Sequence, residues 1–217
     1  MAYLYDPETG RYIESETGDL IPGNFVQGKA EQSIEDSRLT MEIIIDQYNN
    51  GLITIAELDE AGKLAIKDEI IRQYLLGIGG RDQMTQADWG SVGGTIADQY
   101  RYWNEMINAL EAGEITPGEL MSRSKMYIRS STEAYWRAKG RVTSRLGYDE
   151  VNWRFGSTEN HCPTCIERAA MGWQPACENG GFPPECSFPG EGDTECLTNC
   201  DCSLEYRKSD NGEKYNG

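Results

Sequence analysis

The stretch IIDQYNNGLITIAEL, residues 44–58, decides the fold of this chain, because it has the pattern of two helices joined by one tight turn. Asn50-Gly51 is typical of a helix end, where glycine takes a left-handed conformation. Thr54-Ile-Ala-Glu57 has the pattern of a capping box, which begins the next helix. The stretch therefore predicts a helix, a turn and a second helix.

The same unit occurs again in MINALEAGEITPGEL, residues 106–120, at a spacing of 62 residues. The second copy keeps the turn glycine and the Thr-x-x-Glu box, and it adds a proline at the first helical position. The matching residues of this copy are Gly113, Ile115, Thr116, Glu119 and Leu120. Two helix pairs that each bury one apolar face predict a four-helix bundle, with helices at about 29–49, 55–76, 95–112 and 117–146.

Apolar residues on both sides of the first turn follow roughly the three- and four-residue spacing of one helix face. They are Ile34, Leu39, Ile43, Ile44 and Tyr48 before the turn and Leu58, Leu64, Ile70, Ile71 and Leu75 after it. We expect this face to form the core. The glycines at 77–80 and 93–94 predict a flexible connection around Trp89, since they lack the lysine and the preceding strand of a phosphate loop.

Residues 46–57 also have the outline of a calcium-binding EF-hand loop, with Asp46 in the first position, Gly51 in the sixth and Glu57 in the twelfth. Tyr48 in the third position removes one ligand oxygen, and the second copy of the unit lacks most of the ligands. A structural turn is therefore favoured over a calcium site.

The first residues repeat a smaller phrase, DPETGRYI at 6–13 and ESETGDLI at 14–21. Each Thr-Gly is a turn signal flanked by aromatic and β-branched residues, so two hairpin turns are expected before Pro22-Gly23. A hairpin of this size is too small to be stable alone, and we expect it to lie on the surface of a partner.

The net charge of −16 is unevenly distributed along the 217 residues. Residues 1–119 and 159–217 carry −14 and −7, whereas residues 120–158 carry +5. An acidic total argues against a surface that wraps nucleic acid. No apolar run reaches the ~18 residues of a membrane span, and the N-terminus has no signal-peptide pattern, so synthesis in a cytoplasm without membrane insertion is expected.

The basic segment contains interleaved aromatic residues and a row of cations. The cations are Arg123, Lys125, Arg129, Arg137, Lys139, Arg141 and Arg145. Such a helix could contact DNA through its backbone phosphates. A contact with the acidic surface of another protein subunit is the favoured interpretation, because the aromatic residues fit the opposite, buried face of the helix.

Residues 159–202 hold all seven cysteines and the only histidine, His161. Cys162-Pro-Thr-Cys165 is a chelating pair, and a second group follows after a loop rich in glycine and proline. That second group consists of Cys196, Cys200 and Cys202. Two cysteine groups joined by a loop predict a closed structural zinc site, with an iron–sulfur cluster as the alternative. Which of the late cysteines complete the set stays open.

Cys177 and Cys186 lie in the intervening loop without chelate spacing. They are either two loop thiols or a small disulfide formed outside the cytoplasm. Catalysis is not expected, because a cysteine or serine nucleophile needs a base, and the single imidazole of the chain lies inside the cysteine cluster.

The module resembles the C-terminal part of phage and prophage minor head proteins, the head-morphogenesis family. The likeness lies in His161-Cys-x-x-Cys165, in Ala-x-x-Gly-Trp173, and in Cys196-x-x-Asn-Cys200-x-Cys202-x-Leu-Glu-Tyr206. The commoner family pattern ends in His-Pro-x-Cys-Arg-Cys, so here Cys196 stands near the histidine and Asp201 replaces the arginine. The resemblance covers residues 159–206 well and the helical part loosely.

That resemblance implies a structural, non-enzymatic virion protein of a tailed phage, in several copies and in contact with capsid or portal (connector) proteins. The expected fold is mainly α, a helical bundle of two helix-turn-helix repeats. Its expected parts are an N-terminal β-hairpin arm at 1–28, a helical domain at 29–147, and a Cys-rich metal-binding module with a tail at 148–217. The alternative function is a zinc-containing protein that binds nucleic acid through the basic helix at 123–145.

Overall fold

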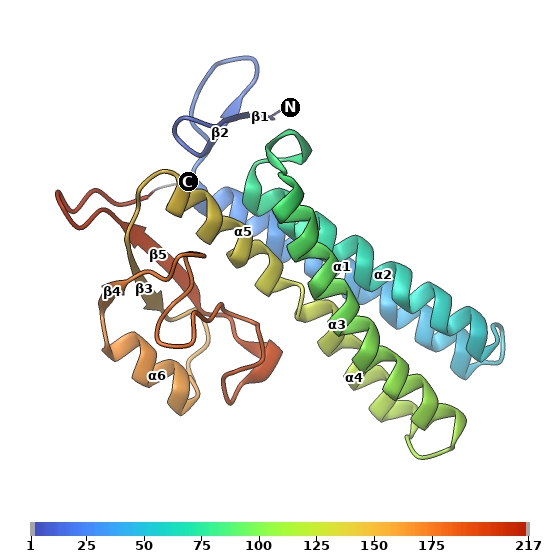
Figure 1. Ribbon diagram of the computed structural model, residues 1–217. Coiled ribbons are helices and arrows are strands. Elements are labelled where there is room, and N and C mark those ends of the chain that lie inside the picture. The colour runs from blue at the N-terminus through green and yellow to red at the C-terminus, as the bar shows by residue number, and fades with distance from the viewer. Residues whose placement is uncertain (1–2, 216–217) are drawn as a thin grey trace.

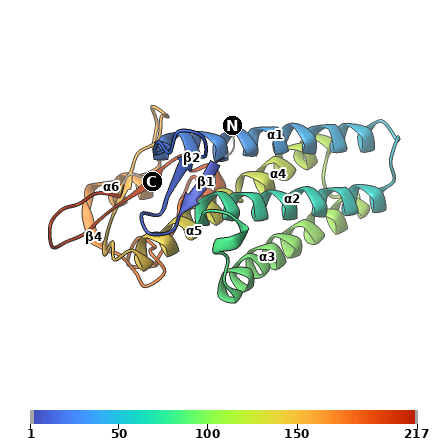
Figure 2. The ribbon, with the colours of Figure 1, turned by 90° about the horizontal axis from the view of Figure 1, so that it is seen from above.

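The computed structural model describes residues 3–215 and is mainly helical, with a small hairpin at the N-terminus and a Cys-rich module at the other end of the chain (Figure 1). The helices are α1 (Gly23–Asn49), α2 (Ile55–Ile78), α3 (Gln86–Glu111), α4 (Pro117–Arg129), α5 (Thr132–Arg145) and α6 (Pro163–Ala170). The long helices lie side by side (Figure 2), and α2 contacts the helices α1, α3, α4 and α5. No helix in residues 3–215 has both the length and the apolar character to cross a membrane.

The two copies of the repeated unit form the same turn. Gly51 N donates to Tyr48 O at 2.9 Å, and Gly113 N donates to Leu110 O at 3.0 Å. Both glycines take a left-handed φ, +69° and +71°, a conformation that costs glycine little. The repeat in the sequence is therefore a repeat of backbone geometry, which turns α1 back on α2 and α3 back on α4.

Capping boxes begin α2 and α4, as the sequence predicts, and a third box begins α3. In the first box, Glu57 Oε2 accepts hydrogen bonds from the Thr54 backbone N at 2.7 Å and from Thr54 Oγ1 at 2.8 Å. The carboxylate that an EF-hand loop would give to calcium is thus used to cap a helix. This contact supports the structural turn.

Two helix starts differ from the expected ones. α1 begins at Gly23, ahead of residue 29, because extended Pro22 ends the arm directly before it. α3 begins at Gln86 instead of residue 95, and the flexible connection expected around Trp89 is wrong. The capping box of Thr85 begins this helix. The glycines that follow do not break it, and a Cβ added at Gly90, Gly93 or Gly94 would meet nothing within 4 Å.

The single helix expected at 117–146 is divided into α4 and α5 at Ser130-Ser131. Ser130 Oγ donates to Tyr127 O at 2.7 Å, and Ser131 Oγ donates to Ile128 O at 2.6 Å. Serine hydroxyls that bond to nearby carbonyls compete with the helical hydrogen bonds. The pair of serines therefore marks the break, and it lets α5 take its own direction towards the C-terminal module.

The buried face of the bundle also differs in part from the expected one. Leu39, Ile43 and Leu64 are exposed by 57%, 59% and 53%. Ile34, Leu58 and Ile70 lie in the core, as expected. The other core residues of these two helices are Met41 and Ile45 of α1 and Ile66, Tyr74 and Ile78 of α2. Spacing of three and four fits more than one stripe on a helix rich in apolar residues, and packing selects among them.

Gly62 on α2 allows α3 to come close. A Cβ at this position would lie 2.0 Å from Cζ2 of Trp103, which is fully buried. We expect Gly62→Ala to lower the free energy of unfolding by about 1–3 kcal/mol, because the ring must move within a packed core. The matched control is Gly28→Ala on α1, which meets nothing within 4 Å. It should raise stability by about 0.5–1 kcal/mol, since alanine favours the helix. Chemical denaturation of both variants checks this prediction, and equal effects would contradict it.

The arm consists of β1 (Tyr3–Asp6) and β2 (Arg11–Glu14), and Ile13 forms a further bridge with Leu20. Both turns thus occur where expected, but the arm packs on its own chain as well. Tyr12 OH donates to Leu76 O of α2 at 3.0 Å. The arm is therefore supported by its own chain, because its tyrosines pack at the end of α2. The expected contact with a partner stays a prediction.

The C-terminal module contains a three-stranded antiparallel sheet of order β4-β3-β5. Its strands are β3 (Glu150–Arg154), β4 (Trp173–Pro175) and β5 (Ser203–Arg207). A second core lies between this sheet and the helices. It joins Trp153, Phe182, Phe188, Leu204 and Tyr206 of the module to Val26 and Ala30 of α1 and to Tyr135 and Trp136 of α5.

Candidate metal centre

Five free cysteines converge at the edge of the sheet. Cys162 directly precedes α6, whose first residue is Pro163, so Cys162 and Cys165 both lie at the start of this helix. Cys196 and Cys200 flank the short helix Leu197–Asn199, and Cys202 directly precedes β5. Thiols from two distant segments are thus brought to one place, as the sequence predicts.

Cys165 lies at the centre of the group. Its Sγ is 3.8 Å from the Sγ of Cys196 and 3.7 Å from that of Cys200. Ligand atoms within 4.8 Å of one another form one group of Cys162, Cys165 and Cys196 and another of Cys165, Cys200 and Cys202. A tetrahedral ion with metal–sulfur bonds of about 2.3 Å holds its sulfurs about 3.8 Å apart. The cysteine cluster therefore has the spacing to hold a metal ion.

The thiols are mostly shielded from solvent. Cys165, Cys200 and Cys202 are buried, and Cys162 and Cys196 are half-buried. Hydrogen bonds to Cys200 and Cys202, with burial, raise the pKa of Cys165 far above its ordinary value. The thiols of Cys165 and Cys200 act in the opposite direction on Cys202 and lower its pKa. Several thiolates so close together repel one another, so their joint deprotonation requires a cation.

Other side chains hold the loops around the cluster. Thr194 Oγ1 lies 3.1 Å from Cys196 Sγ. Arg168, on α6 and buried, donates to Asp193 at 2.8 Å and to Ser187 Oγ at 3.2 Å. Trp153 is buried in the same core as Cys165, Cys200 and Cys202. These contacts could not be predicted from the residues alone. The one signal in the sequence was Arg168, a cation that follows Cys165 by three residues and so lies on the same face of α6.

Cys177 and Cys186 are joined by a disulfide with a Cα–Cα distance of 5.6 Å. They stand apart from the five free thiols. The structure thus divides the seven cysteines into one bridge and one cluster of potential ligands.

The cations of the basic segment have partners within the chain. Lys125 Nζ pairs with Glu42 at 2.6 Å, and Arg137 pairs with Glu133 and Glu191. Lys139 is buried beside the rings of Tyr135 and Tyr215, and burial lowers its pKa to about 7. Arg123 is exposed and Arg129 is half-buried. Much of the positive charge therefore serves contacts inside this chain.

Arg141 and Arg145 of α5 both reach Asp88 at the start of α3. Arg141 Nη1 is 3.2 Å from Asp88 Oδ1, and Arg145 Nη2 is 2.8 Å from Asp88 Oδ2. Asp88 has no exposed side-chain surface and also accepts from Tyr74 OH at 2.8 Å. Burial acts to raise the pKa of Asp88, but its hydrogen bonds from Thr85, Arg145 and Tyr74 outweigh burial and lower it strongly.

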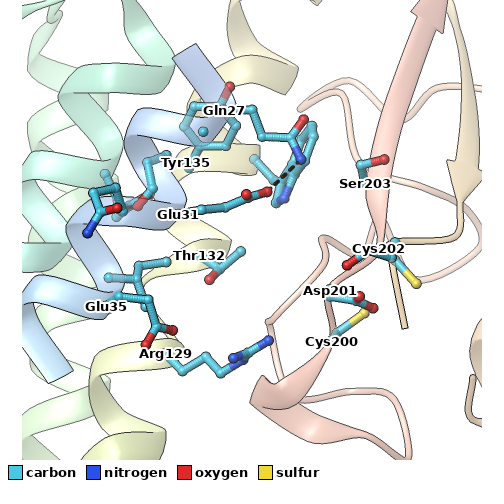
Figure 3. A pocket seen from close by; sticks show the side chains of 18 of the residues that line it. Gln27, Glu31, Glu35, Arg129, Thr132, Tyr135, Cys200, Asp201, Cys202 and Ser203 are labelled. Carbon is cyan, nitrogen blue, oxygen red and sulfur yellow. Dashed lines mark hydrogen bonds between the residues drawn. The ribbon is translucent and has the colours of Figure 1, made fainter. Parts of the chain in front are cut away.

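A cleft of about 650 Å³ lies between the helices and the cysteine module (Figure 3). Glu31 and Glu35 of α1 and Arg129 of α4 line one wall. Asp201 and Cys202 line the wall opposite. Two residues of the cysteine cluster, Cys200 and Cys202, therefore border this cleft.

Comparisons of the chain with models of protein families, with curated proteins and with solved structures found no match.

Proposed function

We propose that this chain is a structural component of a tailed-phage virion, associated with the capsid or the portal, and that zinc holds its C-terminal module together. The observation that carries the zinc centre is the convergence of five free thiols from two distant segments. The resemblance of residues 159–206 to minor head proteins supports the setting in a phage head.

Zinc suits this centre because it binds thiolates in a tetrahedral arrangement. When bound, it supplies a cross-link between α6 and the loop that leads into β5. Other residues of the chain support the loops: Arg168 and Thr194 bond to them, and Trp153 is buried in the same core as Cys165, Cys200 and Cys202. A four-iron cluster fits less well, because each of its irons takes one cysteine, and its irons and sulfides would stand between cysteines that here approach within 4 Å.

The proposed role of the module is to present a rigid surface to other virion proteins. Its sheet packs on α1 and α5 through the second core, so the metal also fixes the module against the helices. Binding of nucleic acid by the basic segment has less support, because Lys125, Arg137, Arg141 and Arg145 already have acidic partners in this chain.

The setting is tested on particles of a phage or induced prophage that encodes the chain. Mass spectrometry of particles purified by density gradient should detect the protein at a constant ratio to the major capsid protein. A phage lacking the gene should yield defective heads. The matched control is a non-structural phage protein, which should wash away. Full recovery of infectious particles without the protein, or its absence from washed particles, would refute the virion role.

A further inference from the structure

A third group of metal-ligating residues lies at the edge of the cysteine cluster. His161, Asp201 and Cys202 have ligand atoms within 4.8 Å of one another. Cys202 also belongs to the group with Cys165 and Cys200. The chain therefore places one imidazole, one carboxylate and one thiol directly beside the proposed zinc centre.

The cluster contains more thiols than one metal ion needs. A tetrahedral ion takes about four ligands, and the cluster offers one thiol more than that. Cys165 approaches both Cys196 and Cys200 at the edge length of a tetrahedron, and Cys162 lies within the same group as Cys165 and Cys196. Cys200 comes from the other group, which shares Cys165, so these four thiols from the two overlapping groups are available to one ion. Cys202 is the thiol left over, and it is the one that has an imidazole and a carboxylate beside it.

Neighbouring residues orient His161 and Asp201. The ring of Phe155 stacks on that of His161 at 4.1 Å between centroids. Thr158 donates to both carboxylate oxygens of Asp201, from N at 3.0 Å and from Oγ1 at 3.1 Å. Contacts of this kind hold ligands of metal sites in place.

Gly156 lets the chain come close to Asp201. A Cβ on Gly156 would lie 2.1 Å from the Asp201 carbonyl oxygen. No other residue would therefore allow the loop after β3 to approach the loop before β5 so closely. This approach brings Phe155 and Thr158 to the two ligands that they orient.

We propose that the chain binds a second zinc ion through His161, Asp201 and Cys202, beside a first ion held by Cys162, Cys165, Cys196 and Cys200. This inference rests on the proposed zinc centre. A set of one nitrogen, one oxygen and one sulfur suits zinc better than calcium or magnesium, which prefer oxygen alone.

Three protein ligands leave one position of a tetrahedral ion for an external ligand. Asp201 and Cys202 line the 650 Å³ cleft, and Arg129 stands on its opposite wall (Figure 3). The external ligand is thus water or a small anion that enters from the cleft. The second ion is more accessible than the first, and a chelator should remove it sooner.

Native mass spectrometry of the full chain, purified with zinc and without oxygen, measures the number of ions. The unmodified protein should carry about two zinc ions, and His161→Ala, Asp201→Asn and Cys202→Ser should each carry about one. Cys202→Ser is the sharpest of these, because it leaves the four thiols of the first site intact. Asp210→Asn is the matched control, since Asp210 is an exposed carboxylate in the turn after β5, and it should keep both ions.

The outcomes separate this inference from the proposed zinc centre. One ion in the unmodified protein would overturn the second site and leave the first, whereas no ion would overturn both. Two ions in His161→Ala and Asp201→Asn would show that these residues are not ligands. Cys202→Ser could also lose both ions while its helical circular dichroism stays unchanged. That result would make Cys202 a ligand of the first ion and refute its assignment to the second.

Discussion

Cys165→Ser is expected to unfold the C-terminal module while the helical bundle stays folded. Cys165 is the thiol shared by the two cysteine groups, so its loss removes the central ligand. Structural zinc contributes roughly 10–16 kcal/mol of apparent binding free energy in small metal domains, as much as the whole stability of a typical domain. If zinc holds the module as proposed, the module is expected to lose its fold when the ion is lost. The bundle has a separate core, which does not depend on the metal.

Hydrogen exchange measured by mass spectrometry checks this result segment by segment. Amides of β3, β4 and β5 should lose protection by several orders of magnitude, whereas those of α2 and α3 should change little. A chelator added to the unmodified protein should have the same effect. The matched control is the double variant Cys177→Ser/Cys186→Ser, which removes two cysteines of the same module outside the cluster. It should keep its zinc and lose roughly 2–3 kcal/mol. Protection of β3 and β5 that survives both Cys165→Ser and the chelator would refute the structural role of the metal.

Asp88→Asn is expected to lower the free energy of unfolding by about 3–5 kcal/mol, because it leaves two arginines beside a buried site without their anion. Asp88 accepts from Arg141, Arg145 and Tyr74 and also caps α3 through Thr85. The variant removes the charge and keeps nearly the same shape. Denaturant titration followed by circular dichroism measures the loss.

The matched control for Asp88 is Asp82→Asn, because Asp82 is an exposed carboxylate in the short helix Arg81–Gln83 before α3. This variant should change the free energy of unfolding by less than about 0.5 kcal/mol. The effect of Asp88 also depends on pH. Because folding lowers the pKa of Asp88, its contribution is present above an unfolded pKa of about 3.9 and is lost as the pH falls below that value. The difference between the unmodified protein and Asp88→Asn should therefore shrink in acid. A difference that is constant from neutral pH to pH 3 would contradict the ion-pair network.

Local signals in the sequence determined much of the fold. The turn glycines and capping boxes are short-range patterns, so the repeated unit and the ends of its helices could be predicted from the residues themselves. The cysteine chelate and the late cysteine group likewise predicted a candidate metal cluster, because chelate spacing is a property of the chain. The helical repeat, the hairpin arm and the Cys-rich module are all present in the structure.

Other features depend on contacts between distant segments. The helices that pack on α1 decide which of its faces is buried, and that face contains Met41 and Ile45. Arg141 and Arg145 both bond to Asp88, which lies more than 50 residues earlier in the chain. The sequence of the basic segment therefore suggests exposed cations, and only the folded bundle shows that these two are paired. The sheet that joins β3 to β5 is equally long-range.

The cysteine cluster shows both contributions. The sequence alone determined that two groups of thiols can chelate, since close neighbours in a chain meet at little entropic cost. Only the tertiary structure decided that Cys165 is shared, that Cys177 and Cys186 stand apart as a bridge, and that His161 and Asp201 meet Cys202. The physical reason is that these contacts form only when the loop after β3 and the loop before β5 come together. Packing of the sheet on α1 and α5 positions both loops.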